Sequence, residues 1–538
     1  MAALEPWIIA ICVLGGTVFL YLILKVFLTS WAANEYVRIK NSLNSSCDID
    51  AFVGPKNPVS PLKVVLAHKF QLGSRQPSQD AIPLELVDSL HVPGLKVSRK
   101  AGSPKSDNDG NVMLLDEFLA EHSKSDKKPI VIATIRMGFG HHRIAYSAAS
   151  WAIKKGHPTI FHDLLNIHSA EADLIKETDE LYSKFSRYAS ELGGPIEKLW
   201  GSAMLSGNAD ALRIASLTAA HLKPLLLSYP KDVLMITSHQ LTALTASAAG
   251  FTNVHNLVVD NHPQWFLTVP NTKNLCQGPV NYQSFLKMGV KPSELACAGH
   301  WCPADMVDNI NEDCQRRIQR AQARVQNSTK KPLRILIPVG GAGAQRKFIV
   351  SFIKVLSPYV KTGKIQLFLN AGDHVHMKQA FLEVLDQCGL EFDTVNDTAG
   401  VFAFQNKMLD PNNEPTKGIT LFSFEEYFPA VATTDILCRV TDLLSCKPSE
   451  MAFYCVPKLH IRRVGDHEAD SACRSSELGD GTVEARELED AREFIDLFLD
   501  TPDLITSMNQ SIMDNNKNGI YSGCKNAVTM AAAIKKNN

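Results

Sequence analysis

The chain has 538 residues, more than one ordinary hydrophobic core accommodates, so two domains with additional segments are expected. Its 55 Lys and Arg residues balance 56 Asp and Glu residues, and the net charge of -1 argues against a global attraction to nucleic acid. The 12 cysteines include no CxxC pair, which argues against a disulfide framework or a structural zinc site and favours a reducing compartment.

The N-terminal segment is uncharged from Trp7 to Leu24, and its apolar run continues past Lys25 to Leu28. A helix of about 18–22 residues is about 27–33 Å long, enough to cross a bilayer. The basic residues follow the run rather than precede it. The sequence therefore predicts a single-pass membrane anchor at residues 7–28, with the bulk of the protein facing the cytoplasm. A buried core helix is the alternative interpretation.

Residues 30–128 are rich in Pro, Ser and charged side chains and are interpreted as a connector with short apolar pieces. The pattern changes at Pro129. There the compact run PIVIATI is typical of a strand, and a glycine loop, a helix ending at Gly156 and a second strand, TIFHDLL, follow it. This βαβ order predicts parallel strands and a first Rossmann-like domain over residues 129–305.

A second strand–glycine–helix unit, RILIPVGGAGAQRKFIVSFIKVL, begins at Arg334. The charged residues 306–330 before it are interpreted as a hinge. Residues 331–520 are predicted to form a second Rossmann-like domain, and residues 521–538 a C-terminal helix. The predicted fold class is therefore α/β, with two Rossmann-like domains and an N-terminal transmembrane helix. Because ligands of such sheets bind beyond the carboxyl ends of the strands, we expect the site between the two domains.

The two glycine loops suit phosphate binding, because glycine lets backbone N–H groups approach a ligand and a following helix N-terminus attracts negative charge. The first loop contains Gly138 and Gly140 and matches neither GxGxxG nor the P-loop. A purely structural turn is the alternative there. The second loop contains Gly340, Gly341 and Gly343 after a clear strand, which favours a ligand.

Several polar and aromatic side chains near these loops allow more than one interpretation. A neutral His141 on the first loop is able to take a proton from a hydroxyl, and one of the pair His141 and His142 is expected to be structural. Asp260, at the end of an apolar strand, is a general base, a partner that orients His141, or a cap of the following turn. Trp265 stacks on a ligand or belongs to the core. The DHVH piece at residues 373–376 lacks further ligands at suitable spacing, so no metal site is predicted.

Four stretches resemble the GT-B glycosyltransferases, most closely monogalactosyldiacylglycerol synthase and the bacterial lipid II-forming N-acetylglucosaminyltransferase. They are GFGHHRIAYSAA, VVDNHPQWF, PVGGAGAQ and RVTDLLSCKPSEMAFYCVPKL. His141 matches the histidine of the family's glycine-rich opening. Thr441, Glu450 and Pro457 match its donor motif in an alignment without gaps. The likeness covers residues 129–532.

The resemblance implies an acceptor site in the first domain and a nucleotide-sugar site in the second. In the family, the glutamate that matches Glu450 holds the donor ribose hydroxyls, and the stretch that contains Glu468 grips the sugar. The residues implied are His141 and Asp260 for catalysis; Gly340, Gly341, Gly343, Thr441, Glu450 and Glu468 for the nucleotide sugar; and Gly138, Gly140, His262 and Trp265 for the acceptor.

The donor motif also departs from the family pattern. Asp442 replaces a lysine, and Leu444, Ser445 and Cys446 replace a Gly-Pro-Gly turn. In this alignment Asp442 would lie beside the diphosphate of the donor and repel it, unless a cation intervened. These differences favour a protein that has kept the fold and lost the reaction.

The sequence thus predicts a membrane-anchored glycosyltransferase that moves a sugar from a nucleotide diphosphate sugar, with UDP as the expected nucleotide. The acceptor is a hydroxyl of a lipid or of another membrane-proximal molecule, and no cofactor, metal or nucleic acid is expected. The alternative is an inactive GT-B-shaped binding or scaffold protein at the membrane. A third hypothesis is a nucleotide-sugar epimerase or hydrolase.

Overall fold

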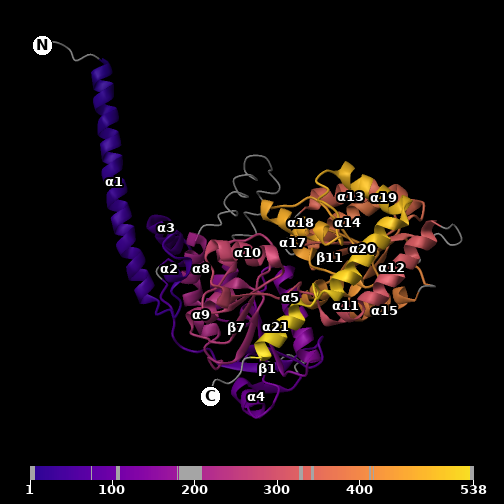
Figure 1. The fold of residues 1–538 in the computed structure, drawn as a ribbon, viewed down its shortest axis with the longest axis horizontal. Helices are drawn as coiled ribbons and strands as arrows, with labels where there is room; N and C mark the ends of the chain where they lie inside the picture. The colour runs from indigo at the N-terminus through magenta and orange to yellow at the C-terminus, as the bar shows by residue number, and fades with distance from the viewer. Residues whose placement is uncertain are drawn as a thin grey trace.

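The computed structural model describes residues 6–73, 75–104, 110–177, 180, 209–325, 331–340, 345–410, 413–415 and 417–533. Within the first helix, side chains are described from residue 22 onward, and the side chains of Val325, Glu450 and Asp466 are not described. Figure 1 shows two α/β halves side by side, with the first helix projecting from the first half.

Nine described strands form the sheet of the first half, in the order β3-β1-β2-β5-β4-β6-β7-β8-β9. Pairing is parallel from β2 to β9, whereas β1 pairs antiparallel with both β2 and β3. All five residues of β4 are buried, as expected for a parallel strand covered on both faces. The strands are β1 Leu84–Asp88, β2 Leu95–Lys100, β3 Val112–Leu114, β4 Ile130–Thr134, β5 Thr159–Asp163, β6 Leu234–Thr237, β7 Val254–Leu257, β8 Lys273–Cys276 and β9 Leu295–Cys297.

The segment interpreted as a connector contributes part of this sheet. Strands β1, β2 and β3 all lie within residues 30–128, and β2 joins the parallel strands through its pairing with β5. These residues therefore fold onto the first half, a point that the sequence left open. The helices of the first half are α1 Pro6–Ser42, α2 Ile49–Val53, α3 Pro61–Leu72, α4 Leu115–Glu121, α5 Phe139–Lys154, α8 Ala209–His221, α9 Gln240–Ala248, α10 Pro279–Met288 and α11 Ala304–Asp308.

The second half contains a sheet of six described strands, all parallel, in the order β12-β13-β11-β10-β14-β15. The chain moves outward from β10 to one side and returns to β14 on the other, so the strand order reverses between β10 and β14. A ligand crevice is expected beyond the carboxyl ends of two such strands. The strands are β10 Leu333–Pro338, β11 Ile365–Gly372, β12 Asp393–Val395, β13 Ile419–Ser423, β14 Leu443–Cys446 and β15 Lys458–His460.

The helices of the second half cover both faces of this sheet (Figure 1). They are α12 Ile310–Val325, α13 Arg346–Lys361, α14 Val375–Gln387, α15 Thr398–Leu409, α16 Tyr427–Cys438, α17 Pro448–Met451, α18 Ala469–Glu477, α19 Leu488–Asp500 and α20 Pro502–Lys517. The prediction of two α/β halves with parallel sheets is confirmed.

The C-terminal helix α21, Gly523–Ala532, returns to the first half, where Figure 1 shows it in yellow near α5. The N–H of Gly523 donates to the carbonyl of His300 over 2.9 Å, and the N–H of His300 donates to the carbonyl of Ile520 over 2.6 Å. A Cβ at position 523 would collide with the carbonyl oxygens of Gly299 and His300. One hydrophobic cluster contains residues of both halves, Trp151 among them, so the halves share a core.

Helix α1 extends away from the first half (Figure 1). Its last third packs against α3 and α8, whereas Leu22, Ile23, Leu24, Val26 and Phe27 are exposed. In the part of the chain that the structure describes, no helix combines the length and the apolar character needed to cross a bilayer. The predicted span at residues 7–28 is therefore unsupported by the described residues. The side chains of the span up to residue 21 are not among those that the structure describes.

Candidate functional site at the boundary between the halves

His141 lies in the first turn of α5, directly after the glycine loop that ends β4. Its Nδ1 is 2.6 Å from the carbonyl oxygen of Ser238, at the end of β6. A carbonyl only accepts, so Nδ1 carries the proton and Nε2 keeps its lone pair. Burial lowers the pKa of His141 to about 4, so the ring is neutral at pH 7. His141 is thus a neutral base whose edge is still partly exposed.

His142, the other member of the pair, points into the first half. Its Nε2 is 3.4 Å from the carboxylate of Asp163, at the end of β5. Asp163 also accepts hydrogen bonds from the N–H groups of Arg136 and Leu165. Burial alone would raise the pKa of Asp163, but His142 and these donors hold it below its ordinary value. His142 is therefore the structural member of the pair, because it is buried and lies between the first turn of α5 and the end of β5.

The first glycine loop also contacts the second half. The hydroxyl of Tyr427 donates to the carbonyl of Gly138 over 3.3 Å, and the ring of Phe139 packs against that of His374. A Cβ at Gly372, where φ is +61°, would lie 2.9 Å from the Phe139 ring, so the close approach requires glycine there. His374 Nε2 is in turn 3.1 Å from the carbonyl of Gly340. Through His374 the structure brings the two predicted glycine loops together.

Arg143 fixes the relative position of the two halves near this contact. Its side chain is buried, its Nε donates to the carbonyl of Val431, and its Nη2 donates to the hydroxyl of Thr434, each over 3.2 Å. Both partners belong to α16 of the second half. Hydrogen bonds from a buried guanidinium are directional, so they set the angle at which the first loop meets the second half.

A second set of contacts across the boundary surrounds Asp260, just after β7. One carboxylate oxygen accepts from the N–H of His262 over 3.3 Å, and the other is 3.8 Å from Nε2 of His467 in the second half. Asp260 thus caps the following turn and also reaches across the boundary. Burial raises the pKa of Asp260, although the His467 ring acts in the opposite direction.

The neighbours of Asp260 follow it across the boundary. His262 Nδ1 is 2.6 Å from the carboxylate of Asp470, and the amide of Asn261 donates to the hydroxyl of Ser471 over 3.2 Å. The predicted acceptor residue His262 is therefore engaged by the second half. Trp265, another predicted acceptor residue, lies 4% exposed in the core of the first half and packs edge-on against Phe52. The prediction that Trp265 stacks on an acceptor is corrected, because its ring is enclosed.

The predicted donor residue Thr441 lies at the amino end of β14, opposite the edge where parallel sheets bind ligands. Its hydroxyl donates to the carbonyl of Leu437 over 2.8 Å, and its own carbonyl accepts from Arg317 over 2.7 Å. These bonds are internal to the second half. The assignment of Thr441 to the nucleotide sugar is therefore corrected, because the strand begins after this residue rather than before it.

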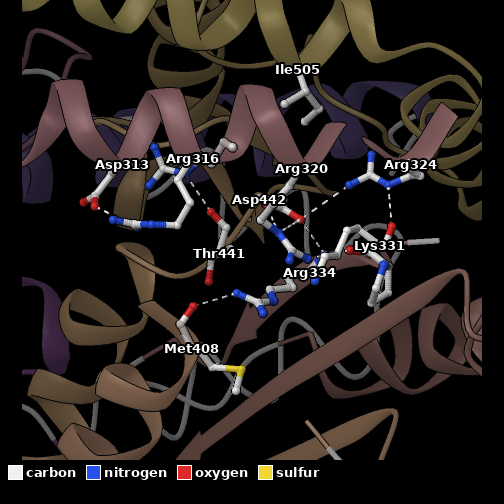
Figure 2. Close-up of polar contacts among 12 residues, drawn as sticks. Asp313, Arg316, Arg320, Arg324, Lys331, Arg334, Met408, Thr441, Asp442 and Ile505 are labelled. Atoms are coloured by element: carbon white, nitrogen blue, oxygen red, sulfur yellow. Dashed lines mark hydrogen bonds and ion pairs between the residues drawn. The ribbon is translucent and has the colours of Figure 1, made fainter. Parts of the chain in front are cut away.

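Asp442 lies at the same amino end, and Figure 2 shows it among arginines of α12 and β10. It accepts from Nε of Arg320 over 3.1 Å, from Nη2 of Arg324 over 3.4 Å and from the backbone N–H of Arg334 over 3.0 Å. Burial alone would raise the pKa of Asp442, but the arginines hold it below its ordinary value. Asp442 is therefore a structural ion-pair partner, and the expected repulsion of a diphosphate at this residue is corrected.

Lys447, which the sequence alignment did not identify as a site residue, lies directly beyond the carboxyl end of β14. Its Nζ lies 3.0 Å from Glu468, which also accepts from the hydroxyl of Ser449 over 2.6 Å and from the N–H of Val464 over 2.9 Å. Burial alone would raise the pKa of Glu468, but Lys447 and these donors hold it below its ordinary value. Glu468, which the sequence assigned to the sugar, thus orients a cation at the carboxyl edge of the sheet.

The remaining predicted residues are placed only in part. Gly140 lies in the first turn of α5. Glu450 lies in α17, and its side chain is outside the described set. Gly341 and Gly343 lie outside the described residues altogether. Among the described residues, no group of three or more His, Cys, Asp or Glu side chains is arranged to hold a metal ion.

The sequence matches two family models, each of them described as a domain of unknown function. DUF6937 matches residues 86–287 and DUF6938 matches residues 290–532. No curated protein matches the sequence. The first match covers most of the nine-stranded sheet, and the second covers the six-stranded sheet and the returning helix α21.

Solved structures with a similar course of the chain include MnaA of S. aureus with UDP. It is 11% identical over 71% of this chain and 91% of that chain, with a TM-score of 0.39. A structure described as trehalose-6-phosphate from E. coli bound with UDP-2-fluoro glucose is 10% identical over 76% and 100%, with a TM-score of 0.36. Spinosyn rhamnosyltransferase SpnG with thymidine diphosphate is 11% identical over 73% and 96%, with a TM-score of 0.30. In sequence, the chain is similar, half by half, to two families of unknown function.

Proposed function

We propose that the protein is a glycosyltransferase that moves a sugar from a nucleotide diphosphate sugar, UDP-linked, to a hydroxyl acceptor. The observation that carries the proposal is the neutral His141, which follows the loop residues Gly138 and Phe139 that contact the second half. The second half contributes Gly340 and Lys447 to its own ligand edge, beyond β10 and β14. A base in one parallel-sheet half and a phosphate-binding set in the other match the two substrates of a transfer reaction.

The proposed roles follow from the chemistry of each group. His141 Nε2 takes the proton of the acceptor hydroxyl as that oxygen attacks the anomeric carbon of the donor sugar. The bond from the sugar to the nucleotide diphosphate breaks, and negative charge develops on the departing diphosphate. Lys447 and the backbone N–H groups that follow Gly340 stabilise that charge. Glu450 is proposed to hold the ribose hydroxyls.

Lys447 also answers the strongest argument for an inactive protein. In the alignment without gaps, the family's lysine was replaced by Asp442. In the structure Asp442 is buried at the opposite end of β14, whereas Lys447 supplies a cation at the end where a diphosphate is expected. Because Leu444, Ser445 and Cys446 replace the Gly-Pro-Gly turn, the backbone there would lie farther from the diphosphate. The Lys447 side chain would therefore supply a larger share of the charge stabilisation.

Nucleotide binding by the full chain in a neutral detergent tests the proposal. We expect calorimetry to show binding of UDP and of UDP-glucose or UDP-galactose, and little binding of GDP-mannose. Lys447→Ala should weaken UDP binding about tenfold or more, because a charged contact to the diphosphate is lost. The matched control is Lys354→Ala, an exposed lysine on α13. If no nucleotide binds, or if the two variants behave alike, the donor site is wrong and the scaffold hypothesis is favoured.

We also propose that residues 7–28 hold the protein at a membrane, with the two halves in the cytoplasm and a lipid as the acceptor. The support is the uncharged run from Trp7 to Leu24 and the exposed apolar side chains of α1 that continue it from Leu22 to Phe27. The full chain is expected to sediment with membranes and resist carbonate extraction, whereas residues 30–538 should remain in the supernatant. Equal recovery of both in the supernatant would contradict the anchor.

A further inference from the structure

A pocket far from the boundary site lies where the last turns of α1 meet α3 and α8. Apolar side chains of the three helices pack together there, with Tyr36 and Ile39 of α1 among them, and Leu43, just after α1, joins them. Beside this contact the helices leave a pocket of about 230 Å³. The polar residues that line it and matter here are Glu35, Arg38, His68, Lys69, Arg75 and His221.

The charges of this pocket are unbalanced. Glu35 accepts from Arg38 over 2.6 and 2.7 Å and pairs with Lys69 over 2.8 Å, so its carboxylate is already occupied. Arg75 pairs with Glu177 over 3.1 Å, but both side chains are largely exposed, and exposed pairs contribute little. Three basic side chains thus line the pocket with one carboxylate, and an anion within it is attracted.

Two buried histidines supply hydrogen-bond donors without acceptors. His68 is 8% exposed and His221 is 5% exposed, and their ring centroids are 5.9 Å apart. Neither ring nitrogen of His68, nor Nε2 of His221, has a hydrogen-bond partner among the described residues. Burial lowers the pKa of both rings, that of His221 to about 4, so each is neutral at pH 7 and keeps one N–H. Leaving a buried polar group without a partner is unfavourable, and a ligand with acceptor atoms would relieve that cost.

We propose that this pocket binds a phosphate group. Three cations and two neutral imidazoles surround the space, and the one carboxylate among these residues is occupied, so the fitting ligand is an anion with several acceptor oxygens. The volume is several times the share of one water molecule in the liquid, about 30 Å³, which leaves room for the group attached to the phosphate. This inference concerns a site separate from the nucleotide-sugar site.

The position of the pocket favours a phospholipid headgroup as the source of the phosphate. Arg38 lies ten residues beyond Leu28, about 15 Å along the same helix. Lys69, on α3, lies closer to the end of the apolar run, because its Nζ is over the ring of Trp31, three residues beyond Leu28. The lipid source rests on the proposed membrane attachment of α1, whereas the phosphate chemistry does not. A soluble phosphate compound is the other source, and the experiment separates the two.

Calorimetry on the full chain in a neutral, phosphate-free detergent tests the proposal with two probes, inorganic phosphate and dihexanoyl phosphatidylglycerol. Binding of the lipid above that of phosphate supports the pocket and identifies a headgroup. Equal binding of both supports the pocket with a soluble ligand. Arg75→Gln and His68→Phe should each weaken binding about tenfold, since one removes a charged donor and the other removes the imidazole N–H. Lys124→Gln, an exposed lysine remote from the pocket, is the control.

Absence of binding by both probes would overturn the proposal, as would binding that neither variant changes. Arg75 is about half exposed, so its substitution tests the site even if the buried His68→Phe variant is unstable. Thermal unfolding of each variant without ligand shows which of them are folded. Nucleotide binding at the boundary serves as an internal reference. It should be the same in wild type and in Arg75→Gln, so the outcome at the pocket is read independently of the proposed transferase activity.

Discussion

Replacement of Asp442 by alanine is expected to destabilise the protein by about 3–5 kcal/mol, because it removes one carboxylate from a buried ion-pair cluster and leaves its arginines with less negative charge to offset them. Asp442 is 1% exposed. Without it, Arg320 and Arg324 lose a counter-charge, and the backbone N–H of Arg334 loses its acceptor inside the protein (Figure 2). Urea unfolding of wild type and variant, followed by tryptophan fluorescence, measures the difference.

The control for this prediction is Asp386→Ala, an exposed aspartate of α14, which should change the free energy of unfolding by no more than about 0.5 kcal/mol. A loss below about 1 kcal/mol for Asp442→Ala would contradict the assigned role. In that case, the remaining partners of the arginines would compensate their charge without Asp442. One of them is Glu414, whose oxygens lie 2.7 Å from Arg320 and 2.8 Å from Arg334.

The same cluster predicts how stability depends on acid. The arginines hold the pKa of Asp442 below its ordinary value of 3.8, so the unfolded chain binds a proton more readily than the folded one. The stabilisation is therefore fully present above pH 3.8 and is lost as the pH falls through the lower folded value. Asp442→Asn should show a smaller loss of stability over this acid range than wild type does.

The two sheets were predictable because their central strands are buried on both faces. Such strands are continuous apolar runs, as in PIVIATI and RILIPVG, and the glycine turns after them mark where helices begin. Strands β1 to β3 lacked this signal. Leu84–Asp88 has three buried residues followed by two partly exposed ones, and it joins the sheet through a partner, β2, that pairs with a strand about 60 residues away.

The candidate site was predictable only where one residue and its local loop define it. His141 follows a glycine loop after a strand, so its place beside the loop that contacts the second half was expected. The register of β14 was not predictable. An alignment without gaps put Asp442 beside the ligand, whereas the strand starts at Leu443, so Asp442 precedes it at the opposite end. The Lys447-Pro-Ser turn resembles any other turn in sequence. Contacts such as His262 with Asp470, 208 residues apart, have no local signal at all.

Replacement of His141 by alanine is expected to lower kcat for sugar transfer by about 10²–10⁴-fold, the usual contribution of a positioned general base. The substrates for this measurement are the nucleotide sugar that calorimetry identifies and a lipid hydroxyl acceptor. Nucleotide binding should remain, because His141 belongs to the first half and the groups proposed to bind the donor belong to the second. His168→Ala, an exposed histidine of the first half, is the matched control and should leave kcat unchanged.

The pH profile of the reaction and two substitutions together distinguish His141 from Asp260 as the base. Burial lowers the pKa of His141 to about 4, so a reaction that depends on its neutral form should lose activity only near pH 4, well below an ordinary histidine. Burial raises the pKa of Asp260. A reaction that depends on its carboxylate should therefore lose activity on acidification, and the loss should begin at a higher pH than for an ordinary aspartate with a pKa of 3.8.

If His141 is the base, Asp260→Asn keeps the acid limb near pH 4 and lowers kcat less than His141→Ala does. If instead Asp260→Asn abolishes transfer and His141→Ala leaves a rate within tenfold of wild type, the proton goes to the carboxylate. The hydrogen bond from His141 to Ser238 would then only position the end of β6.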